Sequence, residues 1–244
     1  MNAFTLTLKE SREVADGTRL FIFDKPEGYE FQAGQYVALT VPNLIAPDEK
    51  RGIRSFSLSS APCQDEIWFT MRNGESGFKK TFWAMQPGSI ITVTKPVGFF
   101  TLNAEDPRPV VFLVGGIGIT PVRSILTQAA HDGSKQAFTL FYANRFLKDA
   151  AYHDEIGALD LPGLKIVDVL SQSDEVCTPH ENEHGYICEE FLSKHVDRIA
   201  DSLYYIVGSP DFITAMETMV LGLGVPKEQI KKDPFTGLTR PKTA

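Results

Sequence analysis

The chain has 244 residues, a length near which a single hydrophobic core gives way to two domains. Hydrophobic residues make up 43% of it and charged residues 23%, as in soluble globular proteins, and a net charge of −7 argues against a general nucleic-acid-binding protein, which needs a basic face. No apolar run is long enough to cross a bilayer, and residues 1–5 lack the basic and apolar regions of a signal peptide. We therefore expect a cytoplasmic protein that does not insert into membranes.

The first hundred residues have the pattern of short strands. Segments rich in β-branched and aromatic residues are separated by turn residues such as Gly, Pro and Asn, and this spacing is typical of an antiparallel barrel. One short helix is predicted over residues 78–85. The predicted strands cover residues 18–24, 35–41, 53–59, 66–71 and 90–94.

After Asn103 the pattern changes to alternating strands and helices. Residues 109–114 form a continuous apolar run, as expected for a strand buried on both faces. Alternation of this kind predicts a doubly wound parallel sheet, with the domain boundary in the polar segment 103–108. The later strands are predicted over 137–143, 164–170 and 203–207, and the helices over 121–130, 149–159, 186–195 and 210–221.

The three cysteines, Cys63, Cys177 and Cys188, are far apart and odd in number. Such spacing does not predict a disulfide framework, and three cysteines cannot supply the four thiolates of an iron–sulfur cluster. We expect reduced thiols and no metal, and we expect any iron–sulfur cluster that works with this chain to belong to a partner.

The first segment with chemical potential is Arg54-Ser55-Phe56-Ser57, on a predicted strand. The guanidinium of Arg54 can hold a phosphate through two parallel charge-assisted hydrogen bonds. The ring of Phe56 can lie against a bound aromatic ring, and the Ser57 hydroxyl can reach a polar atom of that ring. The pattern fits an ordinary strand with an exposed arginine as well, because short motifs of this kind also occur by chance.

Two further segments of this half have residue patterns that bear on ligand binding. Gly34 precedes the aromatic strand start at Tyr36, which fits either a close approach of the backbone or a simple turn. The short helix opens on Gly77-Phe78-Lys79-Lys80. A helix N-terminus attracts anions, and its dipole disfavours lysine there unless an anion is bound. A solvated pair of lysines is the alternative.

Three segments of the second half lie at predicted strand ends. The run from Gly115 to Pro121 joins a buried strand to a helix, and its glycines let the backbone approach a pyrophosphate, although the spacing is not G-x-G-x-x-G. Asn144-Arg145 ends the next strand, where arginine suits the 2′-phosphate of NADPH and an acid would suit NADH. Gly208-Ser209-Pro210 ends a later strand, at the ligand crevice of such a sheet.

In this order, the segments resemble the ferredoxin–NADP(H) reductase family, in particular its short, FAD-containing bacterial branch without an iron–sulfur domain. The resemblance covers nearly the whole chain. It implies a six-stranded antiparallel β-barrel that binds FAD over residues 1–104, and an α/β doubly wound parallel sheet that binds NAD(P) over residues 105–244. FAD is preferred to FMN on the resemblance alone.

The resemblance also implies individual roles. Arg54 and the helix start would hold flavin phosphate, Phe56 would contact the flavin ring, and Arg145 would face the adenosine end of the dinucleotide. The implied catalytic residues are Ser57, near flavin N5, Thr120, close to flavin and nicotinamide, and Phe235, over the flavin. The implied cofactor-binding residues are Tyr36, Arg54, Ser55, Phe56, Ser57, Thr70, Met71, Arg72, Gly77, Phe78, Lys79, Lys80, Gly115, Gly116, Gly118, Thr120, Pro121, Asn144, Arg145, Gly208, Ser209, Pro210 and Phe235.

The chain departs from the family pattern in three places. Many members have a cysteine beside the nicotinamide where this chain has Val207, and a hydroxyl at the helix start where it has Lys79. The tail beyond Phe235 ends without an aromatic residue, so a packing role is the alternative for Phe235.

The implied function is an FAD-dependent NAD(P)H oxidoreductase that moves a hydride between nicotinamide and flavin N5, with NADPH preferred, and exchanges single electrons with a ferredoxin or flavodoxin. Two alternatives share the motifs. One is a flavin reductase that releases reduced flavin. The other is a non-catalytic electron-relay or redox-sensing subunit, which is considered because Val207 replaces the cysteine found in many members. Five basic residues could form a docking face for an acidic electron carrier: Arg51, Lys79, Lys80, Lys231 and Lys232. Ordinary surface charges in contact with solvent are the alternative explanation for them.

Overall fold

The structure is a computed structural model that describes residues 3–176 and 179–235. Two compact units are present, and each takes more than one stretch of the chain. Unit 1 contains the chain up to Leu102, Thr120–Gly133 and Ala151–Leu159, and unit 2 contains Asn103–Ile119, Ser134–Ala150 and the chain from Asp160 on. Among the described residues, no helix combines the length and the apolar character that a membrane span requires. Cys63 and Cys188 are free thiols, and Cys177 lies outside the described residues.

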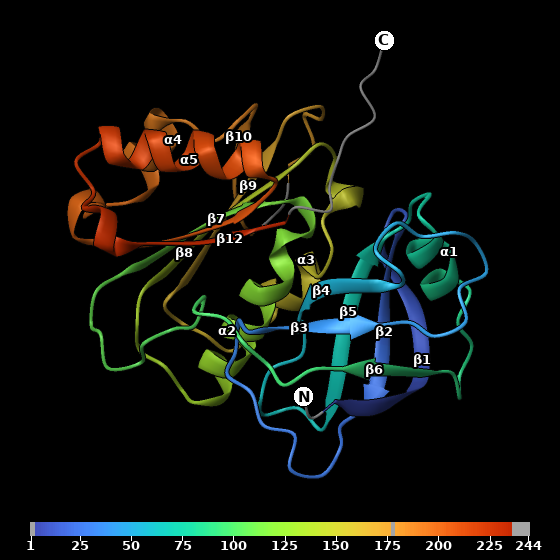
Figure 1. Cartoon of the computed structure of the whole chain (residues 1–244). Coiled ribbons are helices and arrows are strands. Elements are labelled where there is room, and N and C mark those ends of the chain that lie inside the picture. Colours follow the sequence, from blue (N-terminus) through green and yellow to red (C-terminus); the bar gives the residue numbers. More distant parts are fainter. Residues whose placement is uncertain (1–2, 177–178, 236–244) are drawn as a thin grey trace. The chain divides into compact units, whose positions relative to one another are not determined.

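Unit 1 is built on a six-stranded antiparallel sheet in the order β4-β3-β6-β1-β2-β5 (Figure 1). This confirms the predicted antiparallel architecture of the first half. The strands are β1 Phe4–Ala15, β2 Thr18–Asp24, β3 Tyr36–Thr40, β4 Ile53–Ser57, β5 Glu66–Arg72 and β6 Ile90–Val93.

The sheet of unit 1 surrounds one apolar core. Alternate residues of a strand point to the same face, so Leu6 and Leu8 of β1 and Phe21 and Phe23 of β2 all enter this core. Each such side chain contributes about 1.5–3 kcal/mol when it is fully buried. The core therefore fixes which faces of the strands are left for other contacts.

Helix α1, Gly77–Trp83, packs on the same core. Ser76 caps its N-terminus, because its hydroxyl accepts the backbone N–H of Lys79 at 3.2 Å. Phe78 and Phe82 are buried and stack on each other with ring centroids 5.6 Å apart. The helix predicted from the sequence is thus present, and its first turn lies next to the sheet.

Strand β1 was missed by the sequence analysis, although it is the longest strand of the unit. Its pairing with β2 shifts register between Leu8 and Glu10 and again between Glu13 and Ala15. Each irregularity interrupts the alternation of apolar and polar residues, and that alternation is the signal by which a strand is recognised.

Two helices from the second half of the chain belong to unit 1. They are α2, Ile119–His131, which belongs to unit 1 from Thr120 on, and α3, His153–Gly157. Arg123 of α2 is 1% exposed and donates to the backbone oxygen of Ser59 at 2.5 Å. Its other nitrogen pairs with Glu155 of α3. This arginine therefore connects both helices to the segment that follows β4.

The helix predicted over residues 149–159 was wrong in extent. The chain instead forms a 3-10 turn at Leu147–Asp149 and begins α3 only at His153. Tyr152 between them has a left-handed backbone with φ of 62°, which ends a regular helix. Its buried side chain hydrogen-bonds to the hydroxyl of Thr70, so a tertiary contact compensates for the local strain.

Unit 2 contains a six-stranded parallel sheet in the order β10-β9-β8-β7-β11-β12. The chain adds β8, β9 and β10 on one side of β7 and then β11 and β12 on the other, so the direction reverses between β7 and β11. Such a topological switch point is where open α/β sheets bind ligands. The strands are β7 Val110–Gly115, β8 Phe138–Asn144, β9 Leu164–Leu170, β10 Glu181–His184, β11 Leu203–Gly208 and β12 Ile230–Pro234.

Helices α4, Glu189–His195, and α5, Pro210–Gly222, cover one face of this sheet (Figure 1). They contribute Leu192, Ile213 and other residues to an apolar cluster shared with the sheet strands. The predicted parallel architecture is confirmed. The two outermost strands, β10 and β12, were not predicted, because edge strands are polar and lack the apolar pattern of central ones.

Gly34 shows why the chain needs glycine before β3. Its φ is 92°, and a Cβ there would lie 2.0 Å from the carbonyl oxygen of Phe100, so the close approach holds rather than the simple turn. We expect Gly34→Ala to lower the free energy of unfolding by about 2 kcal/mol, from backbone strain and the clash together. Gly28→Ala is the control, because Gly28 has φ of 71° but open space around it, and should cost about 1 kcal/mol. Urea unfolding measures both, and equal losses would contradict the role of the clash.

Candidate functional site

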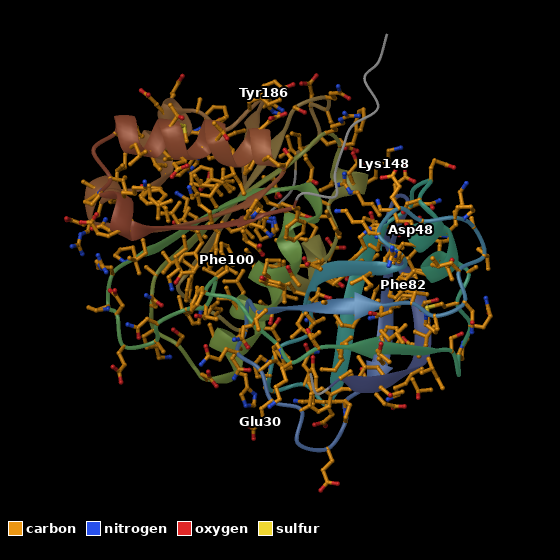
Figure 2. The ribbon with its side chains drawn as sticks, in the orientation of Figure 1. Glu30, Asp48, Phe82, Phe100, Lys148 and Tyr186 are labelled. Atoms are coloured by element: carbon orange, nitrogen blue, oxygen red, sulfur yellow. The ribbon has the colours of Figure 1, made fainter. Side chains whose placement is uncertain are left out.

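Arg54, on β4, holds its guanidinium as a two-pronged fork against Asp48. Nη1 donates to Oδ1 at 2.9 Å and Nη2 donates to Oδ2 at 2.6 Å. The same Oδ2 accepts the backbone N–H of Phe78, in the first turn of α1, at 3.1 Å. The Asp48 side chain is 0% exposed and that of Arg54 is 20% exposed. Asp48 lies beside α1 (Figure 2). Two groups predicted to hold phosphate, Arg54 and the start of α1, therefore meet at one anionic group.

The ring of Phe78 is a common neighbour of Arg54 and Phe56. The guanidinium carbon lies 5.2 Å from its centroid, and the ring of Phe56 stacks on it at 5.6 Å. Arg54 and Phe56 are two residues apart on β4, so their side chains leave the strand on the same side. Phe56 is half-buried, with part of its ring packed on the core and part accessible.

Ser57 and Tyr36 stand opposite each other across the β3–β4 ladder. Ser57 is 7% exposed, whereas Tyr36 is half-buried and Ser55 is exposed. The β-ladder therefore sets Tyr36 of β3 beside Ser57, while the alternation along β4 puts Ser55 and Ser57 on the face opposite to that of Arg54 and Phe56.

Cationic side chains collect near the start of α1. Burial lowers the pKa of Lys79, and the charges of Arg72 and Arg54 lower it further. Lys80 differs, because it pairs with exposed Glu75 at 2.8 Å. Like charges gathered at one place repel one another, so the arrangement suits a multiply charged anion.

Several predicted residues of unit 1 are buried. The hydroxyl of Thr70 bonds to that of Ser59 at 3.1 Å as well as to Tyr152, and Met71 lies in the apolar core. Thr120, 3% exposed, and Pro121, also buried, begin the part of α2 that belongs to this unit. A contribution of Met71 to cofactor binding would therefore come from its backbone.

In unit 2 the glycine turn after β7 is shaped by close packing against β11 and α5. A Cβ on Gly118 would lie 2.8 Å from the carbonyl oxygen of Val207, and one on Gly115 would lie 3.3 Å from the ring of Phe212. Gly116 has φ of 53°, a conformation that glycine adopts without strain. The glycines thus let the backbone turn at the switch point while the two strand ends stay close.

The end of β11 gathers the remaining predicted residues of this edge. The Ser209 hydroxyl accepts the N–H of Phe212 at 3.3 Å and so caps α5, which begins at Pro210. The N–H of Phe235 donates to the carbonyl of Gly208 at 2.8 Å, and Phe235 is half-buried. One backbone hydrogen bond therefore holds Phe235, which follows β12, at the end of β11.

Asn144, the last residue of β8, has an amide without a hydrogen-bond partner. Its side-chain oxygen and nitrogen are both buried, and neither finds a partner among residues 3–176 and 179–235. The residue is 8% exposed, whereas neighbouring Arg145 is exposed. A buried polar group without a partner costs about 1–3 kcal/mol, which a ligand with matching donors and acceptors can recover.

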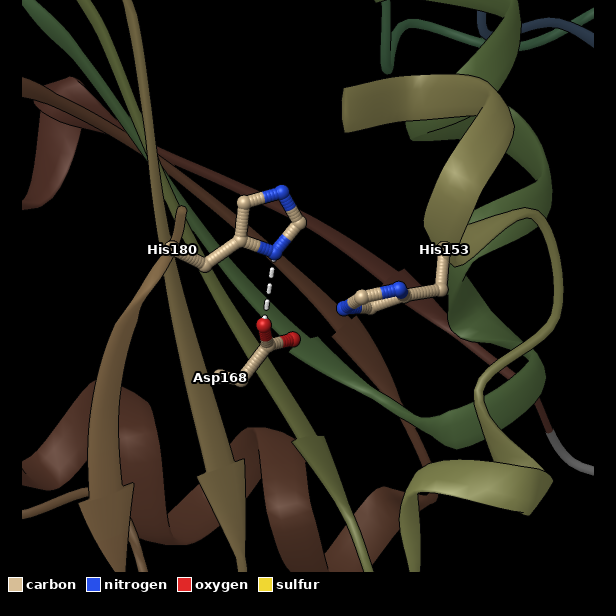
Figure 3. A group of neighbouring side chains, drawn as sticks. All are labelled: His153, Asp168 and His180. Carbon is tan, nitrogen blue, oxygen red and sulfur yellow. Dashed lines mark hydrogen bonds and ion pairs between the residues drawn. The ribbon is translucent and has the colours of Figure 1, made fainter. Parts of the chain in front are cut away.

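Sequence reasoning missed Asp48 and a buried pair in unit 2. Asp168, 1% exposed on β9, forms a hydrogen bond with Nδ1 of His180 at 2.7 Å (Figure 3). An acid within the otherwise apolar run of β9 is a signal that could have identified Asp168. No such signal identifies Asp48, because an aspartate is an ordinary residue in a polar loop.

Known proteins similar to this chain are oxidoreductases. Residues 112–218 match the family model described as the oxidoreductase NAD-binding domain. The flavohemoprotein of Bacillus subtilis is 31% identical over an alignment of 235 residues, and the match covers 93% of this chain and 57% of that protein. The reductase component of propane 2-monooxygenase from Mycolicibacterium goodii is 31% identical over an alignment of 222 residues, and the match covers 87% of this chain and 61% of that protein. The chain thus spans less than two thirds of either relative.

Solved structures share the fold. A ferredoxin NADP⁺ reductase from Neisseria gonorrhoeae with bound FAD and NADP has a TM-score of 0.80 and 21% identity, and the match covers 95% of this chain and 98% of that one. A flavohemoglobin from Malassezia yamatoensis has a TM-score of 0.81 and 19% identity, over 97% and 61%. Residues 112–218 thus match an oxidoreductase NAD-binding domain, and the whole fold is similar to that of FAD-binding reductases, among them the ferredoxin NADP⁺ reductase from Neisseria gonorrhoeae.

Proposed function

We propose that the chain is an FAD-dependent NAD(P)H oxidoreductase, which moves a hydride between nicotinamide and flavin N5 and exchanges single electrons with a ferredoxin- or flavodoxin-type carrier. The observation that carries the proposal is the Arg54 fork, which lies with Lys79 and Arg72 at the start of α1. The match of residues 112–218 to the oxidoreductase NAD-binding domain and the FAD and NADP bound in the similar Neisseria structure support it.

The residues of unit 1 fit a flavin with a diphosphate. Arg54 would bind the phosphates through its two parallel N–H groups, and Lys79 would add a charge that burial keeps from solvent. Phe56 would lie against the ring system with its accessible part, and Ser57 would offer a hydrogen bond near N5. When bound, the flavin supplies the capacity to accept a hydride and to release electrons one at a time.

The residues of unit 2 fit a dinucleotide at the switch point. The backbone of the turn at Gly115–Gly118 would approach the pyrophosphate, and the unpaired amide of Asn144 would bind the nucleotide. The exposed Arg145 favours NADPH over NADH. We retain Thr120 and Phe235 as proposed catalytic contacts. Val207 does not exclude hydride transfer, because this reaction requires no thiol nucleophile.

Replacing Asn144 with leucine, which has a similar volume, separates binding from stability. We expect the affinity for NAD(P)H to fall about tenfold, because the amide no longer meets the ligand. The midpoint of thermal unfolding should stay the same or rise, because a buried polar group without a partner is removed. Titration calorimetry and thermal unfolding measure the two effects. A lower midpoint with unchanged dinucleotide affinity would show that Asn144 has a structural role.

The basic surface residues give only limited support to an acidic electron carrier, because two of them pair with carboxylates of this chain. Arg51 is exposed in unit 1, but Lys80 pairs with Glu75 there, and in unit 2 Lys232 pairs with Glu217 at 2.6 Å. The curated relatives include the reductase component of propane 2-monooxygenase, so an oxygenase component is an acceptor to compare with a ferredoxin or flavodoxin. Reduction of a ferredoxin, a flavodoxin and cytochrome c by the FAD-loaded chain, compared side by side, tests the choice of acceptor.

Retention of flavin tests the proposal against a flavin reductase. The chain is loaded with FAD and passed through a gel-filtration column. A reductase with resident flavin leaves the column yellow, with about one FAD per chain, the ratio expected for a prosthetic group. Complete loss of FAD from a folded chain would favour a flavin reductase, which uses flavin as a substrate.

A further inference from the structure

The loop between β3 and β4 is folded tightly over the start of α1. The N–H of Ile45 donates to the hydroxyl of Thr81 at 3.0 Å. A Cβ on Gly77 would lie 2.2 Å from the carbonyl oxygen of Ala46 and 2.4 Å from that of Pro47, so the loop backbone passes directly over the first residue of the helix. This path delivers the next residue, Asp48, to the fork of Arg54.

The carboxylate of Asp48 is bound as a phosphate would be. Oδ1 accepts one prong of Arg54 and the backbone N–H groups of Lys50 and Gly52, each of these two at 3.1 Å. Oδ2 accepts the other prong and the N–H of Phe78. Parallel guanidinium donors joined by backbone N–H groups are the usual environment of a phosphate in proteins.

We propose that Asp48 is an internal competitor for the flavin diphosphate, so that it sets the affinity of unit 1 for phosphate-bearing flavins. The inference rests on the proposed function. Arg54 has one fork, and a fork that binds the Asp48 carboxylate in a bidentate manner cannot bind a phosphate in the same way. The diphosphate therefore replaces a hydrogen-bonded carboxylate rather than water.

The competitor is charged under all ordinary conditions. The paired Arg54 guanidinium outweighs the effect of burial and holds the pKa of the Asp48 carboxyl well below its usual range. A diphosphate carries more negative charge than one carboxylate, so Lys79 and Arg72 favour the diphosphate in the exchange. Riboflavin, which has no phosphate, does not take part in it.

The test uses the full chain after its flavin has been stripped. Asp48→Asn removes the charge and keeps one accepting oxygen, which can take the place of Oδ1 and accept the N–H groups of Lys50 and Gly52. Glu75→Gln is the matched control, because it removes one negative charge from an exposed side chain beside Lys80. Asp48→Ser, a second neutral variant with an accepting hydroxyl, repeats the test if the asparagine variant is unfolded by circular dichroism.

We expect Asp48→Asn to bind FAD about tenfold more tightly than the natural chain, as when one charge-assisted competitor leaves the fork. Its affinity for riboflavin should change by less than about twofold, since only the phosphate meets Arg54. Inorganic pyrophosphate should raise the midpoint of thermal unfolding more in this variant than in the natural chain.

Weaker or unchanged FAD binding by Asp48→Asn would overturn the inference, because it would mean that the carboxylate orients the fork for the flavin. An equal increase in FAD affinity in Glu75→Gln would also overturn it, since the loss of any one negative charge near the site would then explain the effect. If the chain binds neither FAD nor riboflavin, the proposed function fails, and the pyrophosphate measurement decides the role of Asp48 by itself.

Discussion

Arg123→Met is expected to lower the free energy of unfolding of unit 1 by about 3–5 kcal/mol, the cost of breaking a buried charged network. The guanidinium is almost fully buried and lies over the rings of Trp68 at 4.2 Å and Tyr152 at 5.2 Å. It donates to the backbone oxygen of Ser59 and to the side chain of Gln64, at 2.5 and 2.9 Å. Methionine fills much of the space but supplies none of these donors.

The loss has two physical parts. The carbonyl of Ser59 would remain buried without its charged donor, and the cation–π contacts with both rings would disappear. The hydrogen bonds that would remain between these helices and the rest of unit 1 include Thr70 with Tyr152, the Ser124 hydroxyl to the backbone oxygen of Ser60, and the N–H of Cys63 to the side-chain oxygen of Gln128. We therefore expect the start of α2, with Thr120, to lose its fixed place beside the sheet.

Urea unfolding followed by tryptophan fluorescence measures the effect. Both tryptophans of the chain, Trp68 and Trp83, lie in unit 1, so the signal reports on this unit. Lys80→Met is the control, because Lys80 forms an exposed pair with Glu75 in the same unit and should cost no more than about 1 kcal/mol. Equal changes in the two variants would show that Arg123 does not hold the helices in place.

Replacing Arg54 should weaken FAD binding about 100-fold, or about 2.8 kcal/mol, because a bidentate contact with phosphate is lost. Asp48 complicates the single variant, since its buried carboxylate would lose its partner and destabilise the fold. The double variant Arg54→Met with Asp48→Asn removes both charges and isolates the contribution of the fork.

Arg54→Lys provides a sharper comparison. Lysine keeps the charge but cannot place two parallel N–H groups on one phosphate, so a large part of the affinity should still be lost. Fluorescence titration with FAD and with riboflavin measures both variants. Unchanged FAD affinity in the double variant, or an equal loss for riboflavin, would show that Arg54 does not bind phosphate.

The sequence predicted most of the fold because the central elements bury regular apolar patterns. The run of β7, for example, is buried along its length, and tertiary packing has little to override there. β1 was missed because bulges break its period, and the extent of α3 was missed because Tyr152 adopts a left-handed backbone to reach Thr70. Such features are determined by contacts between residues far apart in the sequence, and local sequence patterns carry no information about these contacts.

The candidate site was predictable to a similar degree. Residue types and spacing identified Arg54, the helix start and the glycine turn, because phosphate chemistry demands donors and glycines at strand ends. The partner of Arg54 could not be found in this way, since the path of the loop over Gly77 brings Asp48 to it. The unpaired amide of Asn144 likewise becomes visible only when burial is known.

Anaerobic reduction of the FAD-loaded chain tests the central claim most directly. We expect NADPH, and NADH more slowly, to abolish the visible absorption of the bound flavin, and the absorption to return when an electron acceptor is added. A chain that retains FAD but whose flavin neither dinucleotide reduces would contradict the account, because hydride transfer to the flavin would then be absent.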